Sequence, residues 1–275
     1  MWTISGFADE VTDDFAAQLR FLNRRGIRFI ELRSAWGIKV CDLDDAQVRR
    51  IKQLLDDHGI AVSALGTDLG KIRLDDDFAG HLDRAKRAAE VAWRLETSDV
   101  RGFSFLMADG EDRDACRSEV INRLGEIVAV TDAADIRYLH ENEADVWADT
   151  PARCADLVGY LPRLTFGLVF DAANYVQAGI HPFSDAYPVV RDATRYVHVK
   201  DAHLADGSIC VPGEGDGQWP ELLAALRDDD FDGFLSMEPH LASQGAFGGF
   251  SGADEWTRAH ESLVRLLNAS GVAYS

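Results

Sequence analysis

The sequence predicts a single-domain (β/α)8 TIM barrel over residues 1–275, because eight short apolar runs alternate with amphipathic segments along the chain. Each run is rich in β-branched and aromatic residues, and no linker rich in proline or serine interrupts the series. The expected strands are Thr3 to Phe7, Arg28 to Leu32, Ile60 to Leu65, Val100 to Phe105, Ile136 to His140, Thr165 to Phe170, Arg195 to Val199 and Gly233 to Met237.

The segments between these strands have the spacing and the boundary residues of helices. After the second strand, apolar residues recur on one helical face at Val48, Ile51 and Leu54. Asp44 with Gln47 predicts a capping box at the start of this helix, and His58-Gly59 predicts its end. Ser251 is expected to cap the last helix.

An open, doubly wound sheet is the alternative architecture. Strands such as Leu168 to Phe170 are continuously apolar, which is typical of parallel strands that are covered on their outer face by helices. The open sheet is less favoured because no G-x-G-x-x-G follows the first strand. The closed barrel is therefore the prediction.

Composition argues against several classes of partner. The chain has 28 basic and 47 acidic residues, a formal charge of −19, which opposes binding to nucleic acid and to anionic membranes. No run of 18 apolar residues indicates a transmembrane span, and the N-terminal MWTISGFADE does not resemble a secretory signal. The four cysteines are far apart and form no C-x-x-C pair, which favours a reducing, cytoplasmic location.

Four consecutive strands end in residues that can bind a metal. They are Glu141, Asp171, His198 and Glu238. In a TIM barrel the carboxyl ends of all strands meet at one mouth, so these side chains are expected to converge. Three carboxylates and an imidazole would crowd together there without a compensating cation. One divalent metal ion resolves this conflict; the oxygen-rich set favours Mn²⁺, with Mg²⁺, Co²⁺ or Zn²⁺ also possible.

The same region carries a family resemblance. The strings HENE (140–143), FDAAN (170–174), YVHVKDA (196–202), PGEGDG (212–217) and MEPHL (237–241) occur in this order. Together they resemble the sugar phosphate isomerase/epimerase family of the xylose-isomerase-like TIM barrel superfamily. The resemblance implies a metal held by Glu141, Asp171, His198 and Glu238, with the two glutamates as the proton-transferring pair. Tyr196 stands where the family has the first histidine of its H-x-H string, which alters an expected substrate contact.

The predicted function is that of a metal-dependent sugar isomerase or epimerase. Glu141 and Glu238 would remove a proton next to a carbonyl and return it, through an enediolate that the metal stabilises. A sugar or inosose dehydratase using the same site is the alternative. An abasic-site endonuclease is remote, because Asn174 stands where such enzymes carry histidine and the net charge opposes DNA. A barrel that binds sugar without turnover is disfavoured by the presence of both glutamates, and a homo-oligomer is possible.

Further polar residues near the expected mouth are candidates for substrate binding. The candidates are Glu143, Asn174, Lys200, Asp201, His240, Lys71 and Arg33. Lys200 and Asp201 could instead pair with each other, and Arg33 could instead pair with Glu31. Few basic residues are expected at the mouth, so the sequence does not indicate a phosphorylated sugar. The glycine-rich segment from Ser243 to Gly252, with Phe247 and Phe250, could be a lid or a subunit contact.

Overall fold

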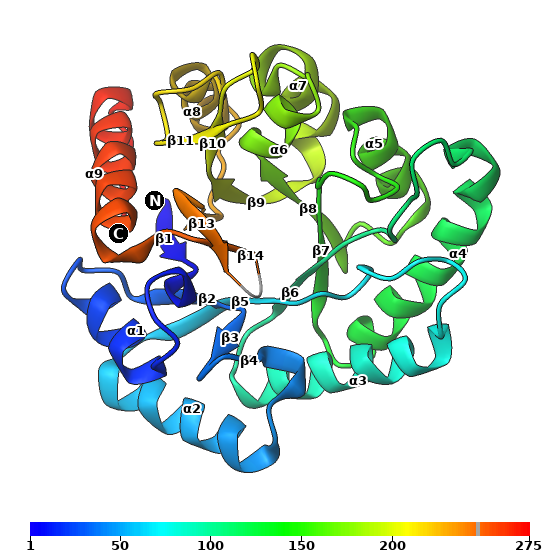
Figure 1. The fold of residues 1–275 in the computed structure, drawn as a ribbon, viewed down its shortest axis with the longest axis horizontal. Helices are drawn as coiled ribbons and strands as arrows, with labels where there is room; N and C mark the ends of the chain where they lie inside the picture. The colour runs from blue at the N-terminus through cyan, green and yellow to red at the C-terminus, as the bar shows by residue number, and fades with distance from the viewer. Residues whose placement is uncertain (246–247) are drawn as a thin grey trace.

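Eight parallel strands form a nearly closed barrel in the computed structural model (Figure 1). The strands are β1 (Thr3–Gly6), β2 (Phe29–Leu32), β5 (Ala61–Gly66), β6 (Asp99–Gly102), β7 (Arg137–Glu141), β8 (Phe166–Asp171), β9 (Thr194–Val199) and β12 (Phe234–Met237). Their order in the sheet is β1-β12-β9-β8-β7-β6-β5-β2, so every strand after β2 lies beside its predecessor and β12 closes onto β1. The predicted single-domain (β/α)8 barrel is confirmed.

Helices surround this sheet and cover its outer face (Figure 1). They are α1 (Phe15–Asn23), α2 (Asp45–His58), α3 (Phe78–Arg94), α4 (Arg113–Asp132), α5 (Pro151–Tyr160), α6 (Ala172–Gln177), α7 (Tyr187–Val190), α8 (Trp219–Asp228) and α9 (Gly252–Ser270). All six residues of β8 are buried, as expected for a parallel strand between the barrel interior and the helices.

The boundaries of two helices test the predicted caps. At the start of α2 the Asp44 carboxylate accepts a hydrogen bond from the Gln47 backbone, and the Gln47 side chain accepts one from the Asp44 backbone. The helix ends at Gly59 with a φ of 61°, a left-handed conformation that favours glycine. Ser251 does precede α9, but its hydroxyl donates to Glu10 instead of capping the helix.

The loops at the carboxyl ends of the strands form three short hairpins. These are β3 (Ser34–Ala35) with β4 (Ile38–Lys39), β10 (Asp201–Ala202) with β11 (Ile209–Cys210), and β13 (Ala242–Gly245) with β14 (Gly248–Phe250). The structure describes residues 1–245 and 248–275, so the predicted lid residue Phe247 lies outside the described residues.

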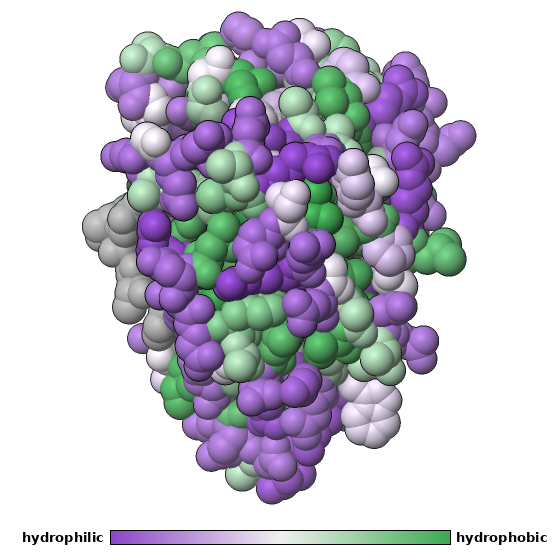
Figure 2. Space-filling model, turned by 90° about the vertical axis from the view of Figure 1, so that its right-hand side faces the viewer, coloured by the Kyte–Doolittle hydropathy of each residue, from purple (hydrophilic) through white to green (hydrophobic). Residues whose placement is uncertain are grey.

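One side of the outer surface is mostly hydrophilic. On the side drawn in Figure 2, hydrophilic side chains separate small apolar areas. Within the described ranges, no helix has both the length and the apolarity needed to cross a membrane.

Candidate metal centre and substrate cavity

Four strands bring one cluster of potential metal ligands together at the barrel mouth. Glu141 ends β7, Asp171 ends β8, His198 lies one residue before the end of β9, and Glu238 follows β12 directly. Each residue offers one ligand atom, and these four atoms lie within 4.8 Å of one another. All four residues are buried. The convergence expected from the strand ends is therefore present in the fold.

Two buried atoms of this cluster make no hydrogen bond within the described residues. His198 Nδ1 lies 3.2 Å from Glu141 Oε1 and 3.3 Å from Glu238 Oε2. Neither His198 Nδ1 nor Asp171 Oδ2 has a hydrogen-bond partner among the described residues, although both atoms are buried. A buried imidazole nitrogen and buried carboxylate oxygens that face one another fit a divalent cation, because the cation would satisfy all of them at once.

The other ring nitrogen of His198 is held from the opposite side. Nε2 lies 3.1 Å from Glu31 Oε2, and Ser236 Oγ donates to the same carboxylate oxygen at 2.7 Å. Glu31 belongs to β2, and its side chain is buried inside the barrel, with the residue 1 % exposed. This carboxylate orients the imidazole so that Nδ1 faces the cluster, which is a common arrangement behind metal-binding histidines.

Two asparagines fix the carboxylates. Asn174 Nδ2 donates to Glu141 Oε1 at 3.1 Å, and the Asn174 backbone donates to Asp171 Oδ1 at 2.8 Å. The Asn142 side chain makes two hydrogen bonds of 2.9 Å to the backbone of Asp171. The ends of β7 and β8 are thus joined by amide groups, which leaves the carboxylates few alternative positions.

Three buried cations surround the cluster. Lys200 Nζ lies 3.0 Å from Asp171 Oδ2 and 3.4 Å from Glu238 Oε2. Arg101 Nε lies 3.2 Å from Glu141 Oε2, and Arg33 Nη1 lies 3.7 Å from Glu238 Oε1. Each proposed proton-transferring glutamate therefore has its own arginine.

Burial and crowding shift the pKa values of these groups in opposite directions. Burial raises the pKa of Asp171, and the nearby Lys200 only partly offsets this effect. Burial also acts to raise the pKa values of Glu141 and Glu238, but nearby cations outweigh it and hold both below their usual range. Burial lowers the pKa of His198, yet the surrounding carboxylates outweigh burial and raise it. A ligating histidine is neutral, so metal binding would release this proton.

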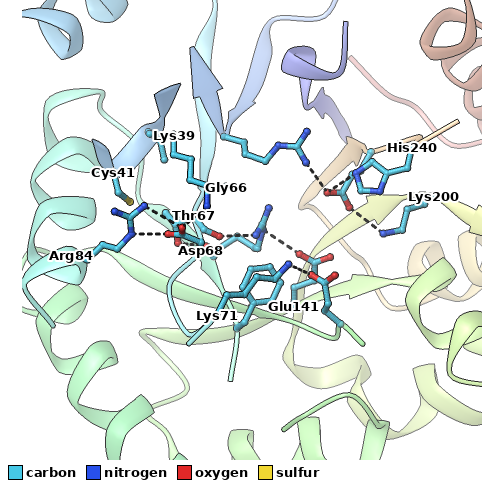
Figure 3. Close-up of a pocket in the computed structure, with 16 residues that line it drawn as sticks. Lys39, Cys41, Gly66, Thr67, Asp68, Lys71, Arg84, Glu141, Lys200 and His240 are labelled. Atoms are coloured by element: carbon cyan, nitrogen blue, oxygen red, sulfur yellow. Dashed lines mark hydrogen bonds and ion pairs between the residues drawn. The ribbon is translucent and has the colours of Figure 1, made fainter. Parts of the chain in front are cut away.

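A cavity of about 280 Å³ opens above the cluster (Figure 3). Glu141 and Glu238 line it, whereas Asp171 and His198 lie deeper and are fully buried. Five of the predicted substrate-binding residues also line it: Arg33, Lys71, Glu143, Lys200 and His240. The volume is just below the range of about 300–1,000 Å³ typical of ligand pockets, which favours a small substrate.

Two predicted substrate contacts lie elsewhere. Asn174 is not part of the cavity lining and instead holds Glu141. Asp201 is also outside the lining, because its carboxylate accepts backbone hydrogen bonds from Ala202, Gly213, Gly215 and Gly217. Asp201 therefore organises the PGEGDG loop. It does not line the cavity, contrary to the predicted contact between Asp201 and the substrate.

Two alternative pairings considered from the sequence are also wrong. Lys200 forms ion pairs with Asp171 and Glu238 rather than with its neighbour Asp201. Arg33 makes a two-pronged ion pair with Asp9, with bonds of 2.8 and 3.1 Å, while Glu31 faces His198. Glu31 and Arg33 therefore do not pair with each other: Arg33 pairs with Asp9, and Glu31 contacts His198.

Tyr196, the substitute for the first histidine of H-x-H, lies below the site. It is 1 % exposed, and its hydroxyl is 2.8 Å from Ser63 Oγ within a small apolar layer of the barrel. Tyr196 does not line the cavity, so this position offers no side chain to a substrate there.

Sequence reasoning missed two buried charged residues, one that lines the cavity and one that lies behind His240. Arg101 lies in the predicted fourth strand, contacts Glu141 and lines the cavity. Glu10 follows β1 and is completely buried; it accepts hydrogen bonds from Ser251 and from the backbone of His240. The available signal for Arg101 was a charged residue inside an apolar run that is predicted to be buried.

Comparison with known proteins agrees with this architecture. A model of the xylose isomerase-like TIM barrel family matches residues 19–266. The chain belongs to the xylose isomerase-like TIM barrel family. No curated protein sequence gives a match. The fold of this family is shared with solved structures of low sequence identity.

Three such structures illustrate the range. A D-psicose 3-epimerase with D-tagatose from Clostridium cellulolyticum H10 is 15 % identical, with a TM-score of 0.73 and coverage of 98 % of both chains. A probable 3-DHS dehydratase involved in petrobactin synthesis from Bacillus anthracis is 18 % identical, with a TM-score of 0.75 and coverage of 96 % of this chain and 98 % of the other. A xylose isomerase-like TIM barrel protein from Mycobacterium smegmatis in complex with magnesium is 17 % identical, with a TM-score of 0.74 and coverage of 98 % of both. At these identities the likeness establishes the fold.

Proposed function

We propose that this chain is a divalent-metal-dependent sugar isomerase or epimerase that moves a proton on a carbon next to a carbonyl. The observation that carries the proposal is that Glu141 and Glu238 belong to the four-ligand cluster and also line the cavity. Both carboxylates can therefore reach a substrate that lies against the cluster.

Glu141, Asp171, His198 and Glu238 would hold the ion. When bound, a divalent ion supplies stabilisation of the negative charge that develops on substrate oxygens as the proton leaves. The predominance of oxygen ligands supports Mn²⁺ as the first choice, with Mg²⁺, Co²⁺ and Zn²⁺ as alternatives. Magnesium in the mycobacterial relative agrees with a hard divalent ion.

The two glutamates are the proton-transferring groups. Glu141 comes from β7 and Glu238 from the end of β12, with β8 and β9 between them in the sheet. A substrate between the two carboxyl groups would lose a proton to the ionised one and receive a proton on its opposite face from the other in its protonated form, which inverts the carbon. If one carboxylate carries the proton between adjacent carbons, the product is the isomer with a shifted carbonyl.

The surrounding residues hold these two carboxyl groups in position. Arg101 and Asn174 contact Glu141, while Lys200 and Arg33 contact Glu238. Fixed positions matter here, because a base must lie within hydrogen-bond reach of the proton that it removes.

Deuterium exchange tests the proposal directly. The metal-loaded protein is incubated in heavy water with a panel of ketoses, aldoses and inososes, and the products are followed by NMR. We expect deuterium at one carbon next to the carbonyl, together with inversion or carbonyl migration. Loss of water would indicate the dehydratase alternative, which the Bacillus anthracis relative makes reasonable. No exchange with any sugar would contradict the proposal.

The variants Glu141→Gln and Glu238→Gln sharpen this test. Removing a positioned acid or base costs about 10²–10⁴-fold in rate, so each variant should lose exchange to that extent. Their bound metal is measured alongside, because both residues are also ligands. Glu119→Gln is the matched control, since Glu119 is half exposed and pairs with Arg123 on the surface of α4.

We further propose a small carbohydrate as the only substrate class, with no nucleic-acid or membrane partner. The small cavity and the charge of −19 support this view. A cytoplasmic location and a homo-oligomeric state stay predictions.

A further inference from the structure

The cavity extends away from the metal ligands to a second polar end. Figure 3 shows Lys39, Asp68 and Arg84 on one side of the cavity, with Lys200 and His240 on the other. Lys39 comes from β4, Asp68 from the loop after β5, and Arg84 from α3. All three line the cavity, and we call them the far end.

Basic residues are more frequent in the lining than the sequence indicated. The six that line the cavity are Arg33, Lys39, Lys71, Arg84, Arg101 and Lys200. The expectation of few bases at the mouth is therefore wrong. Their number alone does not make an anion site, because a cation that is already paired with a carboxylate attracts a further anion less. The partners of these six residues therefore decide which substrates the cavity accepts.

At the far end, two cations and two carboxylates balance. Asp68 Oδ2 lies 2.9 Å from Lys39 Nζ, and Asp68 Oδ1 accepts a hydrogen bond from Arg84 Nε at 2.7 Å. The two terminal nitrogens of Arg84 also donate to the two carboxylate oxygens of Asp42. Burial acts to raise the pKa of Asp68, but hydrogen bonds from Arg84 and Lys39 outweigh it and lower the pKa to about 2. Asp68 is thus ionised and neutralises its neighbours.

The other four cations of the lining are paired as well. Lys71 Nζ lies 2.6 Å from a carboxylate oxygen of Glu143. Lys200, Arg33 and Arg101 each contact a carboxylate of the metal cluster. Within the described residues, the carboxylates paired with the six cations are Asp9, Glu31, Asp42, Asp68, Glu141, Glu143, Asp171 and Glu238. Eight carboxylates against six cations leave two negative charges, which one divalent ion would balance.

A wall of balanced charges favours hydroxyl groups over anions. A hydroxyl both donates and accepts, so it can bond to Asp68 and to Lys39 without changing the balance of charge. A phosphate or carboxylate in the same place would lie beside the Asp68 carboxylate. No unpaired cation of the far end would compensate that anion for the hydration that it loses.

We propose that the substrate is an uncharged sugar, whose hydroxyl groups, and no phosphate or carboxylate, contact the far end. This inference rests on the proposed function for the position of the carbonyl at the metal cluster. Asp68 is then the residue that determines specificity, because it is the one carboxylate that pairs with both Lys39 and Arg84.

Calorimetric titration of the metal-loaded protein tests this inference. Each D-2-ketohexose is compared with its 6-phosphate, and fructose is also compared with fructuronate, in which C6 is a carboxylate. We expect at least one free ketose to bind about tenfold or more tightly than its 6-phosphate, because a charged group buried without a partner carries at least that cost. No charged form should bind as tightly as the corresponding free ketose.

Asp68→Asn should reverse this preference. The amide no longer neutralises Lys39 and Arg84, so a phosphate gains charge-assisted hydrogen bonds at the far end. We expect the affinity for the 6-phosphates to rise about tenfold or more, whereas the affinity for the free ketoses should not rise.

A second variant and a control accompany Asp68→Asn. Asp42→Asn removes the other partner of Arg84 at a side chain that is 48 % exposed, so it keeps the test if Asp68→Asn does not fold. It should raise the affinity for the 6-phosphates by a smaller factor, because water screens this pair. Asp83→Asn is the matched control: it makes the same change in net charge on α3, at a residue that pairs with Lys86 outside the cavity lining. It should change no affinity.

Three results would overturn the inference. They are a 6-phosphate or fructuronate that binds as tightly as its free ketose, no binding by any free ketose, and an affinity for the 6-phosphates that stays the same in both far-end variants. The titrations also separate this inference from the proposed function. A free ketose that binds but exchanges no deuterium would support the uncharged substrate and contradict the proposed function, and exchange on a 6-phosphate alone would do the opposite.

Discussion

The imidazole of His198 is held between two carboxylates, with Nε2 3.1 Å from Glu31 Oε2 and Nδ1 3.2 Å from Glu141 Oε1. Glu31 is therefore a positioning residue that acts through His198. It fixes which ring nitrogen faces the cluster, and it favours the tautomer that leaves Nδ1 free for a metal.

Glu31→Gln tests this role. The amide is a weaker acceptor for the Nε2 proton and can present a donor instead, so we expect metal affinity to fall about 10–100-fold. Titration of the metal-free protein with Mn²⁺ measures the change. Glu119→Gln provides the surface control, and an unchanged affinity in Glu31→Gln would show that Glu31 does not support the metal centre.

Asp171→Asn should raise the stability of the metal-free protein and remove the stabilisation that metal gives. Burial raises the pKa of Asp171, so its ionised form is unfavourable in the folded, metal-free protein. Each unit of pKa shift corresponds to about 1.4 kcal/mol, and the neutral amide should stabilise the metal-free protein by at least about that amount near pH 8. Lys200 keeps a contact with Glu238 in the variant.

The same variant should not respond to metal. A ligand at about 100 times its dissociation constant stabilises a protein by about 2.7 kcal/mol, which raises the melting temperature of the unmodified protein by several degrees. Melting curves with and without Mn²⁺ compare the two proteins. An Asp171→Asn protein that melts earlier without metal, or that gains as much from metal as the original, would contradict this reasoning.

Glu10 should make stability depend on pH. Burial raises the pKa of this carboxyl to about 8, although Arg33 and the Ser251 hydroxyl act in the opposite direction. A raised pKa means that the folded protein favours the protonated form. The stabilising contribution is thus complete below the ordinary pKa of about 4.5 and is lost as the pH rises towards 8.

Urea unfolding near pH 5 and near pH 8 measures this effect in the metal-free protein. As the pH rises from 5 to 8, the unfolding free energy of the original protein should fall by up to a few kcal/mol more than that of Glu10→Gln. Glu214→Gln is the exposed control, since Glu214 is half exposed and pairs with Arg258. Parallel pH profiles for the original protein and Glu10→Gln would rule the effect out.

Gly249 should be intolerant of a side chain because His240 packs against it. A Cβ at Gly249 would lie 1.8 Å from His240 Cδ2, and the Gly249 backbone donates to His240 Nε2 at 3.1 Å. His240 lines the cavity, so Gly249→Ala should displace it and raise the KM for substrate while leaving Mn²⁺ affinity within about twofold.

The control for this change is Gly159→Ala. A Cβ there would meet no atom within 4 Å, and alanine is favoured over glycine within helix α5. If Gly249→Ala had the same KM as Gly159→Ala, His240 would have no role in binding substrate.

The sequence was most informative where local pattern and barrel geometry act together. The positions of Glu141, Asp171, His198 and Glu238 follow from where strands end, because parallel strands of a barrel share one mouth. The capping box at Asp44 follows from local hydrogen bonding alone. Such features need no knowledge of distant contacts.

The residues that were misjudged depend on contacts between distant parts of the chain. Asp201 is turned away from the cavity by backbone N–H groups of a loop up to 16 residues later. Arg101 and Glu10 are charged residues at buried positions, and only the assembled barrel shows which opposite charges and hydrogen bonds compensate them. Side-chain direction in loops and the pairing of buried charges are tertiary properties.

The most direct test of the metal centre is a crystal grown with MnCl₂ and measured at the manganese absorption edge. We expect one anomalous peak in contact with Glu141, Asp171, Glu238 and the Nδ1 atom of His198. A peak at a different site, or no peak in crystals of protein that exchanges deuterium on its sugar, would contradict the account.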